Sequence, residues 1–215
     1  MLDKLETVIH EPVGAVESVI IWMHGLGADA NDFASLVPEL GLKNTRFIFP
    51  NAPIRPVTVN GGMSMRSWYD FLTFEFSKGE DVGELMVSVK QIGELIQQQI
   101  AEGISLSNII VGGFSQGGAV ALLVPGLLDL QGRLGGVVAW STYLPEQCAV
   151  LWDKYPPVFM AHGTYDQVIP IAVGQKSKDS LIAHTVSLEW HEYPMEHQVC
   201  QQQFVDLKKW ITRRQ

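Results

Sequence analysis

Short apolar runs alternate with amphipathic helical patterns along almost the whole chain, and this alternation limits its possible folds more than any other feature. The runs stop after a few positions, as strands buried on both faces of a parallel sheet do. We predict such strands at 18–23, 46–49, 108–113, 136–140 and 157–161. A sixth run, 185–191, alternates apolar and polar residues, so we place it nearer the edge of the sheet.

Helical patterns separate these runs. The clearest covers 81–101, where apolar residues recur at helical spacing and Gly103 follows as a stop signal. Shorter helices are predicted at 31–40, 116–128, 171–183 and 198–213, and Pro125 is expected to end or kink its helix near Val124. Strands and helices in this order predict an α/β fold with a mostly parallel sheet. Because the 215 residues show no shift in composition and no internal repeat, we expect a single domain, 1–215.

Composition and charge exclude several classes of protein. Hydrophobic residues make up 47% of the chain and charged residues 18%, which is a globular rather than a disordered composition. The formal net charge is −8 and no basic stripe is present, so we expect no nucleic-acid partner. The longest apolar runs fall short of the roughly 18 residues that a membrane-spanning helix needs, and charged residues at the N-terminus stand where a signal peptide would need an apolar run. We therefore expect a cytoplasmic protein without stable membrane insertion.

One long segment, 51–78, has no clear period and is rich in proline, glycine and aromatic residues. Segments of this length without regular structure are usually functional or disordered, and the aromatic residues between Trp68 and Phe76 argue against disorder. Two interpretations stay open. The segment is either a loop that covers a substrate or an excursion packed against the core.

The pentad Gly-Phe-Ser-Gln-Gly at 113–117 fits the pattern G-x-S-x-G and lies between a predicted strand and a predicted helix. This is the setting of a nucleophile elbow, a turn so tight that its serine adopts a strained backbone. Gly113 and Gly117 let neighbouring chain pass closely, and Gly118 adds room. The pattern predicts Ser115 as a nucleophile; the alternative is a glycine-rich turn with a surface serine.

A serine hydroxyl needs a base, and the base needs a third group to orient it. His197 follows the last predicted strand in a turn from which its ring can reach the end of the sheet. The other five histidines precede Ser115, lack a convincing intervening acid, or lie in or beside a predicted strand. Asp166 is the first carboxylate after the strand 157–161, where the order Ser, acid, His places the acid. Its alternative role is to close its own turn.

The oxyanion of acyl transfer needs preorganised hydrogen-bond donors. We assign one to the backbone N–H of Gln116 and the other to that of Leu26, in the loop His-Gly-Leu-Gly after the first predicted strand. The alternative for that loop is an ordinary glycine turn. Histidine spacing does not fit a metal site, and neither a phosphate loop nor a dinucleotide-binding turn occurs, so we expect no metal and no cofactor.

Six segments together resemble the carboxylesterase/phospholipase family of α/β hydrolases, which includes the acyl-protein thioesterases. They occur in family order over nearly the whole chain, at 24–27, 50–53, 67–70, 113–118, 162–166 and 197. The resemblance implies an α/β-hydrolase fold with helices on both faces of the sheet and no large cap domain. It also implies a carboxylesterase, thioesterase or lysophospholipase that forms an acyl-enzyme on Ser115. The implied triad is Ser115, Asp166 and His197, with oxyanion donors at Leu26 and Gln116.

The resemblance further implies an acyl groove, for which we name Trp68, Phe71 and Phe74 as substrate-binding residues. The expected substrates are small-molecule esters or acylated proteins and lipids, and the implied assembly is a homodimer. A non-catalytic binding protein on the same fold stays the alternative, although the presence of all three triad candidates favours an enzyme. Pro194 and Glu196 depart from the family pattern. Glu196 either favours the charged form of His197 or points to solvent.

Overall fold

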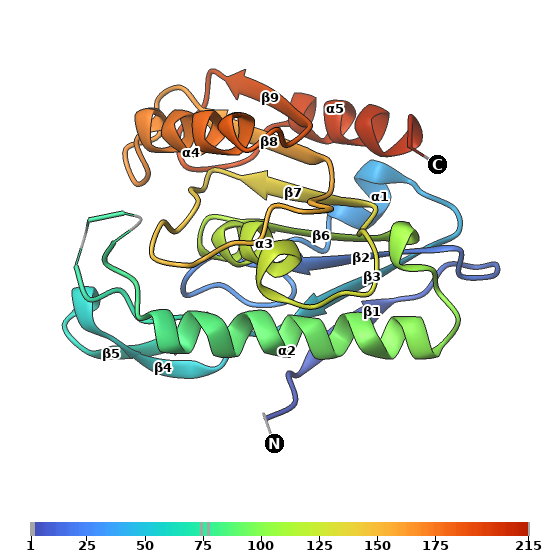
Figure 1. Ribbon diagram of the computed structural model, residues 1–215, viewed down its shortest axis with the longest axis horizontal. Coiled ribbons are helices and arrows are strands. Elements are labelled where there is room, and N and C mark those ends of the chain that lie inside the picture. The colour runs from blue at the N-terminus through green and yellow to red at the C-terminus, as the bar shows by residue number, and fades with distance from the viewer. Residues whose placement is uncertain (1–2, 74, 77, 215) are drawn as a thin grey trace.

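The computed structural model describes residues 3–73, 75–76 and 78–214, and its centre is a seven-stranded sheet (Figure 1). The strands lie in the order β1-β3-β2-β6-β7-β8-β9. β1 is antiparallel to β3, and the other neighbouring pairs are parallel. The strand bounds are β1 Thr7–His10, β2 Ser18–Met23, β3 Thr45–Pro50, β6 Ile109–Phe114, β7 Gly136–Trp140, β8 Val158–Gly163 and β9 Leu188–Tyr193.

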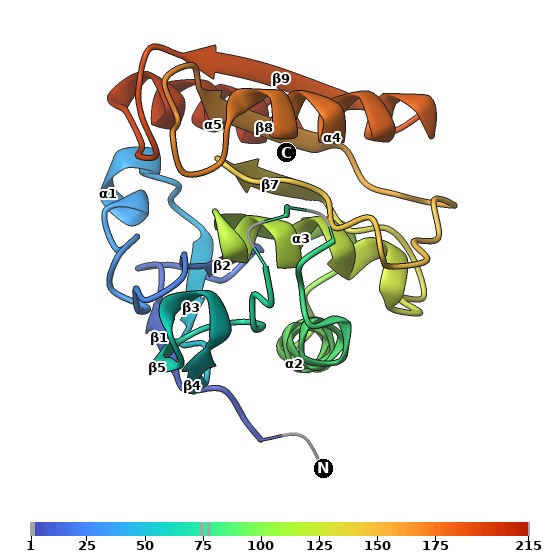
Figure 2. The same ribbon diagram turned by 90° about the vertical axis from the view of Figure 1, so that its left-hand side faces the viewer.

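Helices cover both faces of this sheet, as Figure 2 shows, with α1 and α5 on one side and α2, α3 and α4 on the other. Successive side chains of β2 alternate between the two cores: Val19 and Ile21 pack with α2 and α3, whereas Ile20 and Trp22 pack with α1 and α5. The predicted layered α/β architecture is therefore confirmed. The helix bounds are α1 Leu36–Leu40, α2 Val82–Ala101, α3 Gln116–Leu127, α4 Ile171–Ala183 and α5 Gln201–Thr212.

Two helix predictions were wrong in detail. Residues 31–35 form i→i+3 turns, such as Ala34 N–H to Asn31 O, instead of the first turns of α1. α3 continues through Pro125 to Leu127, so of the two expected effects of this proline, an end or a kink near Val124, the end is wrong. The proline removes one backbone hydrogen bond from the last turn only, and the preceding residues 116–124 are all buried, so packing outweighs that loss.

The long segment after β3 contains a hairpin of β4 (Ile54–Val57) and β5 (Met63–Arg66), joined by a 3₁₀ turn at Thr58–Asn60. After the hairpin the chain returns to the core, where Trp68 and Tyr69 are fully buried. Both interpretations of the segment thus apply in part, and the described residues build no separate cap domain over the sheet. None of the described helices combines the length and the hydropathy that crossing a bilayer requires.

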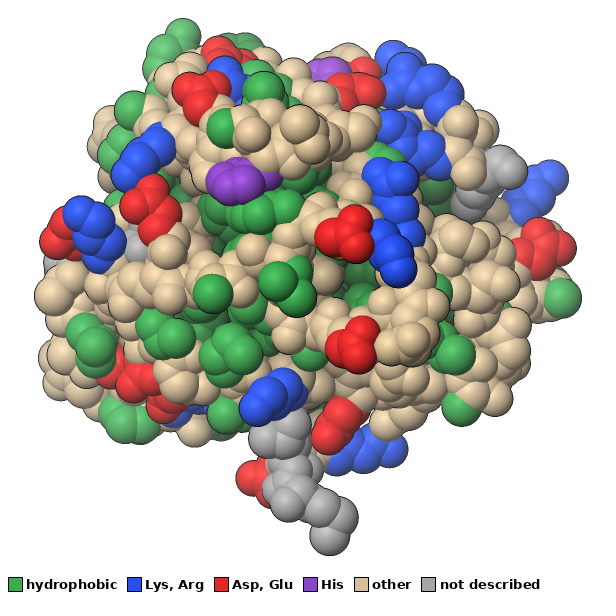
Figure 3. Space-filling model, in the orientation of Figure 1, with side chains coloured by type: hydrophobic (Ala, Val, Ile, Leu, Met, Phe, Trp, Pro, Cys, Tyr) green, Lys and Arg blue, Asp and Glu red, His purple; other side chains and the backbone are tan. Residues whose placement is uncertain are grey.

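Hydrophobic side chains reach the surface at the end of the molecule that carries β4, β5 and the start of α2 (Figure 3). Ile54 and Met63 on the hairpin are 67% and 65% exposed, and Val87 on α2 is also exposed. This is the kind of surface expected of a self-associating protein, but the structure contains one chain, so the homodimer stays a prediction.

Candidate active site

Ser115 lies in the sharp turn between β6 and α3, with φ 54° and ψ −121°. Few non-glycine residues adopt this conformation, and the surrounding hydrogen bonds hold it. The Ser115 N–H donates to Trp140 O at 2.8 Å, and Ser115 O accepts from Thr142 Oγ1 at 2.6 Å. The turn needs glycine on both sides, because a Cβ at Gly113 would lie 2.4 Å from the Gly117 carbonyl carbon, and one at Gly117 2.4 Å from Met23 O.

The structure brings the three predicted triad side chains together from loops at the carboxyl ends of β6, β8 and β9. Ser115 Oγ lies 3.0 Å from His197 Nε2, and His197 Nδ1 lies 2.7 Å from Asp166 Oδ2. With Nδ1–H donating to the carboxylate, Nε2 is free to accept the serine proton. The phenyl ring of Phe114 packs against the imidazole, with ring centroids 4.7 Å apart. This geometry fits a nucleophile, a base and an orienting acid.

Asp166 is held as a carboxylate by its neighbours. Its Oδ1 accepts backbone N–H groups from Val168 at 2.9 Å and Ile169 at 2.8 Å, so it also closes its own turn. His162 Nε2 donates to Ile169 O at 2.8 Å and lies 3.4 Å from Asp166 Oδ2. Burial acts to raise the pKa of Asp166, but hydrogen bonds from His162, His197 and the Ile169 N–H outweigh it, so the pKa lies well below its usual range.

This depressed pKa predicts how the stability of the protein depends on pH. Asp166 binds a proton more readily in the unfolded chain, near its ordinary pKa of about 3.9, than in the folded protein. Its contribution to the free energy of unfolding is therefore complete above about pH 5 and is lost as pH falls toward the lower native value. Urea unfolding from pH 6 to pH 2 should show wild type losing stability faster than Asp166→Asn below pH 5. Parallel curves would contradict the assignment.

The two predicted oxyanion donors lie beside this triad. Gln116 is the first residue of α3, so its backbone N–H has no partner within the helix. In the described part of the chain, the Leu26 N–H donates to no other residue, whereas its neighbour Gly27 donates to Arg66 O at 2.8 Å. Both Leu26 and Gln116 line the cavity that contains Ser115 and His197. The two N–H groups are thus available to a substrate oxygen.

The cavity at Ser115 has a volume of about 520 Å³ and a mainly apolar wall. Phe71 lines it as predicted, together with Phe76 from the same segment and Val59 from the turn after β4. Trp68 was predicted to line it and does not, because its side chain is fully buried and its indole Nε1 donates to His24 O at 2.9 Å. Phe74 lies outside the described residues. The polar residues Asp32, Asn60 and Gln167 also line the cavity.

Pro194 and Glu196, the two departures from the family pattern, are both exposed. In the described residues His197 pairs with Asp166 and not with Glu196, so the solvent-facing alternative for Glu196 holds.

The rings of His184 and His191 pack against aromatic side chains outside the triad. His184 stacks on Trp152 with ring centroids 4.2 Å apart, and His191 stacks on Phe159 with ring centroids 4.9 Å apart. No three His, Cys, Asp or Glu side chains of the described chain gather as metal ligands.

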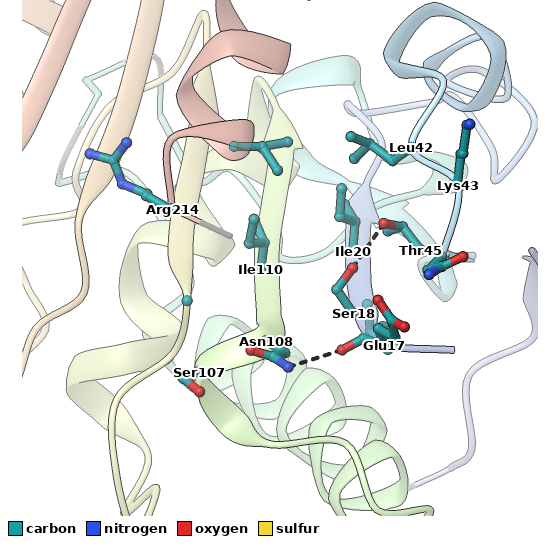
Figure 4. A pocket seen from close by; sticks show the side chains of 14 residues that line it. Glu17, Ser18, Ile20, Leu42, Lys43, Thr45, Ser107, Asn108, Ile110 and Arg214 are labelled. Carbon is teal, nitrogen blue, oxygen red and sulfur yellow. Dashed lines mark hydrogen bonds between the residues drawn. The ribbon is translucent and has the colours of Figure 1, made fainter. Parts of the chain in front are cut away.

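A second cavity, of about 340 Å³, lies at the opposite ends of the strands (Figure 4). It is formed at the amino ends of β2, β3 and β6, where Asn108 Nδ2 donates to Glu17 O at 3.0 Å and the hydroxyls of Ser18 and Thr45 are 2.8 Å apart. None of Ser115, Asp166 and His197 lines it. The chemistry is therefore assigned to the cavity at the carboxyl ends of the strands.

The chain is similar to several known proteins over most of its length. The sequence profile of the family described as Phospholipase/Carboxylesterase matches residues 5–214. Acyl-protein thioesterase 1 of Mycosarcoma maydis is 35% identical over 99% of this chain and 98% of its own length. Its counterpart in Cryptococcus neoformans is 33% identical over 93% of each chain. The crystal structure of Arabidopsis thaliana SOBER1 superposes with a TM-score of 0.81 at 30% identity, covering 93% of this chain and 99% of that one.

Proposed function

The chain belongs to the phospholipase/carboxylesterase family of α/β hydrolases, and from this premise we propose that Ser115, His197 and Asp166 perform its hydrolytic reaction. It is a serine hydrolase that acts on carboxylic esters or thioesters. The observation that supports the residue assignment is the continuous hydrogen-bond chain from Ser115 Oγ through His197 to Asp166. The alternative, a non-catalytic binding protein, gives no reason for these linked hydrogen bonds.

In the proposed mechanism, Ser115 Oγ attacks the acyl carbonyl carbon while His197 Nε2 takes the hydroxyl proton. The Leu26 and Gln116 N–H groups stabilise the resulting oxyanion, and Asp166 stabilises the imidazolium. His197 then protonates the departing alcohol or thiol, which leaves an acyl group on Ser115. Water, deprotonated by His197, attacks that acyl group, and the carboxylic acid is released as Ser115 recovers its proton.

Labelling with a fluorophosphonate, followed by peptide mass spectrometry, tests the nucleophile directly. We expect a single adduct on Ser115 in the wild type and none in His197→Ala, because the hydroxyl is unreactive without its base. An adduct on another serine, or none on folded protein, would contradict the proposal.

The apolar wall of the cavity favours substrates with long acyl chains. Phe76 contacts Phe71 and Tyr143, with ring centroids 6.4 Å and 5.3 Å away. Burying an apolar group of this size is worth about 1.5–3 kcal/mol. Phe76→Ala should therefore lower kcat/KM for octanoyl or longer esters by roughly tenfold or more, and barely change it for acetyl esters. The control is Phe204→Ala, in the core on the other face of the sheet. It should leave unchanged the ratio of kcat/KM for long-chain esters to kcat/KM for acetyl esters. Equal losses for both ester classes would show that this wall is only core.

The relatives named acyl-protein thioesterase favour acylated proteins as substrates of this chain, with acylated lipids as the second class. We place the whole chain, 1–215, in one catalytic domain. The cytoplasmic location and the homodimer stay predictions.

A further inference from the structure

The two candidate oxyanion donors lie on different loops, and their separation has to be fixed for both to reach one oxygen. Leu26 follows β2, whereas Gln116 begins α3 after β6. A third segment, Arg66–Tyr69, contacts both loops and is called here the bridging segment. It begins at the last residue of β5 and is the part of the long excursion that returns to the core.

The bridging segment engages both donors and the acceptor oxygen of the Gln116 side-chain amide. The Trp68 backbone N–H donates to Gln116 Oε1 at 2.8 Å. Gln116 Nε2 donates to Tyr69 O at 2.7 Å and to Ser67 Oγ at 3.0 Å. An acceptor and two donors are therefore satisfied by three consecutive residues, which fixes the residue that carries one oxyanion donor.

The same segment holds the other loop at two points on either side of Leu26. The Trp68 indole Nε1 donates to His24 O at 2.9 Å, and the Gly27 N–H donates to Arg66 O at 2.8 Å. The His24 ring braces this loop as well, since its Nε2 accepts from the Ala52 N–H at 3.1 Å and its Nδ1 donates to Gly25 O at 2.7 Å. Burial lowers the pKa of His24, which keeps the neutral ring that this pattern requires.

Burial makes this arrangement rigid. Ser67, Trp68 and Tyr69 are completely buried, and Gln116 is 1% exposed. Ser88 of α2 anchors the segment from behind by donating to Trp68 O. Losing a single bond would leave a buried polar group unpaired, so the hydrogen bonds support one another.

We propose that the bridging segment sets the separation of the Leu26 and Gln116 N–H groups, with Trp68 and the Gln116 side chain as positioning residues for the oxyanion. The inference rests on the proposed function and adds to it a role for a tryptophan that the sequence predicts to bind substrate. Trp68 acts through His24 O and does not touch the substrate cavity.

The test is Trp68→Phe, which keeps an aromatic ring and removes the donor to His24 O. Its matched control is Trp22→Phe, because Trp22 is equally buried and its indole N–H has no partner among the described residues. Each variant is assayed for kcat and KM on one chromogenic ester and for the Ki of a trifluoromethyl ketone, which adds to the serine and forms an oxyanion. Thermal unfolding checks that both variants are folded.

Removing an oxyanion donor costs about 10²–10³ in kcat, so misplacing one should cost roughly tenfold to a hundredfold. We expect Trp68→Phe to lower kcat and raise Ki by that same factor, with KM within about twofold, and Trp22→Phe to change neither by more than about threefold. Ser67→Ala, a smaller change, should move kcat and Ki together in the same direction by a smaller factor.

Equal losses in Trp68→Phe and Trp22→Phe, or a fall in kcat with Ki unchanged, would overturn the inference and leave the segment as packing. The fluorophosphonate experiment separates this failure from that of the proposed function. A wild type labelled at Ser115 together with an unaffected Trp68→Phe overturns the inference alone, whereas an unlabelled wild type overturns both.

Discussion

Replacing Ser115 by alanine is expected to lower kcat for ester hydrolysis by roughly 10⁴- to 10⁶-fold while the protein stays folded. The substitution removes the oxygen that forms the acyl-enzyme and leaves His197 without the hydroxyl that now lies 3.0 Å from its Nε2. The fold does not depend on that hydroxyl, because the turn is held by backbone groups: the Ser115 N–H donates to Trp140 O, and Ser115 O accepts from Thr142. Alanine has the same Cβ as serine, so the strain at φ 54° is unchanged.

The chain offers a matched control for this variant. Like Ser115, Ser141 has a positive φ, of 46°; it is buried, and its hydroxyl has no hydrogen-bond partner among the described residues. Ser141→Ala should therefore keep kcat within about threefold of the wild type. Steady-state hydrolysis of a chromogenic ester, with unfolding curves for both variants, makes the comparison. If Ser115→Ala kept more than a hundredth of the wild-type rate, Ser115 would not be the nucleophile.

The sequence predicted best the elements with clear local patterns. Two strands, β2 and β7, and the helix α4 have the predicted bounds, because a continuous apolar run or a helical period ends there at unambiguous polar or glycine residues. The glycines around Ser115 indicated the nucleophile elbow because a side chain at these positions would overlap neighbouring atoms. A Cβ at Gly118 would lie 2.7 Å from the side chain of Thr142.

Features that depend on tertiary contacts were missed. β1, Thr7–His10, is short and half-exposed, and only its antiparallel pairing with β3 defines it as a strand. The hairpin of β4 and β5 contains Pro56 and two residues, Arg55 and Arg66, whose charges conceal any strand pattern. Trp68 was predicted to bind substrate because the family resemblance implies an acyl groove along this segment. A local pattern does not indicate that its indole N–H has a carbonyl partner 44 positions earlier in the chain.

Replacing Asp166 by asparagine is expected to lower kcat/KM by about 10⁴-fold, because it reverses the tautomer of His197. The Val168 and Ile169 N–H groups, at 2.9 Å and 2.8 Å from Oδ1, require an acceptor at that position, so the asparagine oxygen must take it. The asparagine NH₂ group then faces His197 Nδ1, now 2.7 Å from Oδ2, and two donors cannot face each other. The imidazole responds by carrying its proton on Nε2, and a protonated Nε2 cannot accept the proton of Ser115.

A control variant separates the effect on the His197 tautomer from the effect of losing a negative charge. Asp179→Asn, which removes an exposed carboxylate of α4 that is paired with Lys178 at 3.2 Å, should leave kcat/KM unchanged. The ¹⁵N NMR shifts of His197 should show the proton on Nδ1 in the wild type and on Nε2 in Asp166→Asn. Because the asparagine keeps the two backbone hydrogen bonds of the loop, the variant should remain folded at neutral pH with its inactive tautomer in place. A variant with the reversed tautomer and near-normal turnover would mean that His197 is not the base that activates Ser115.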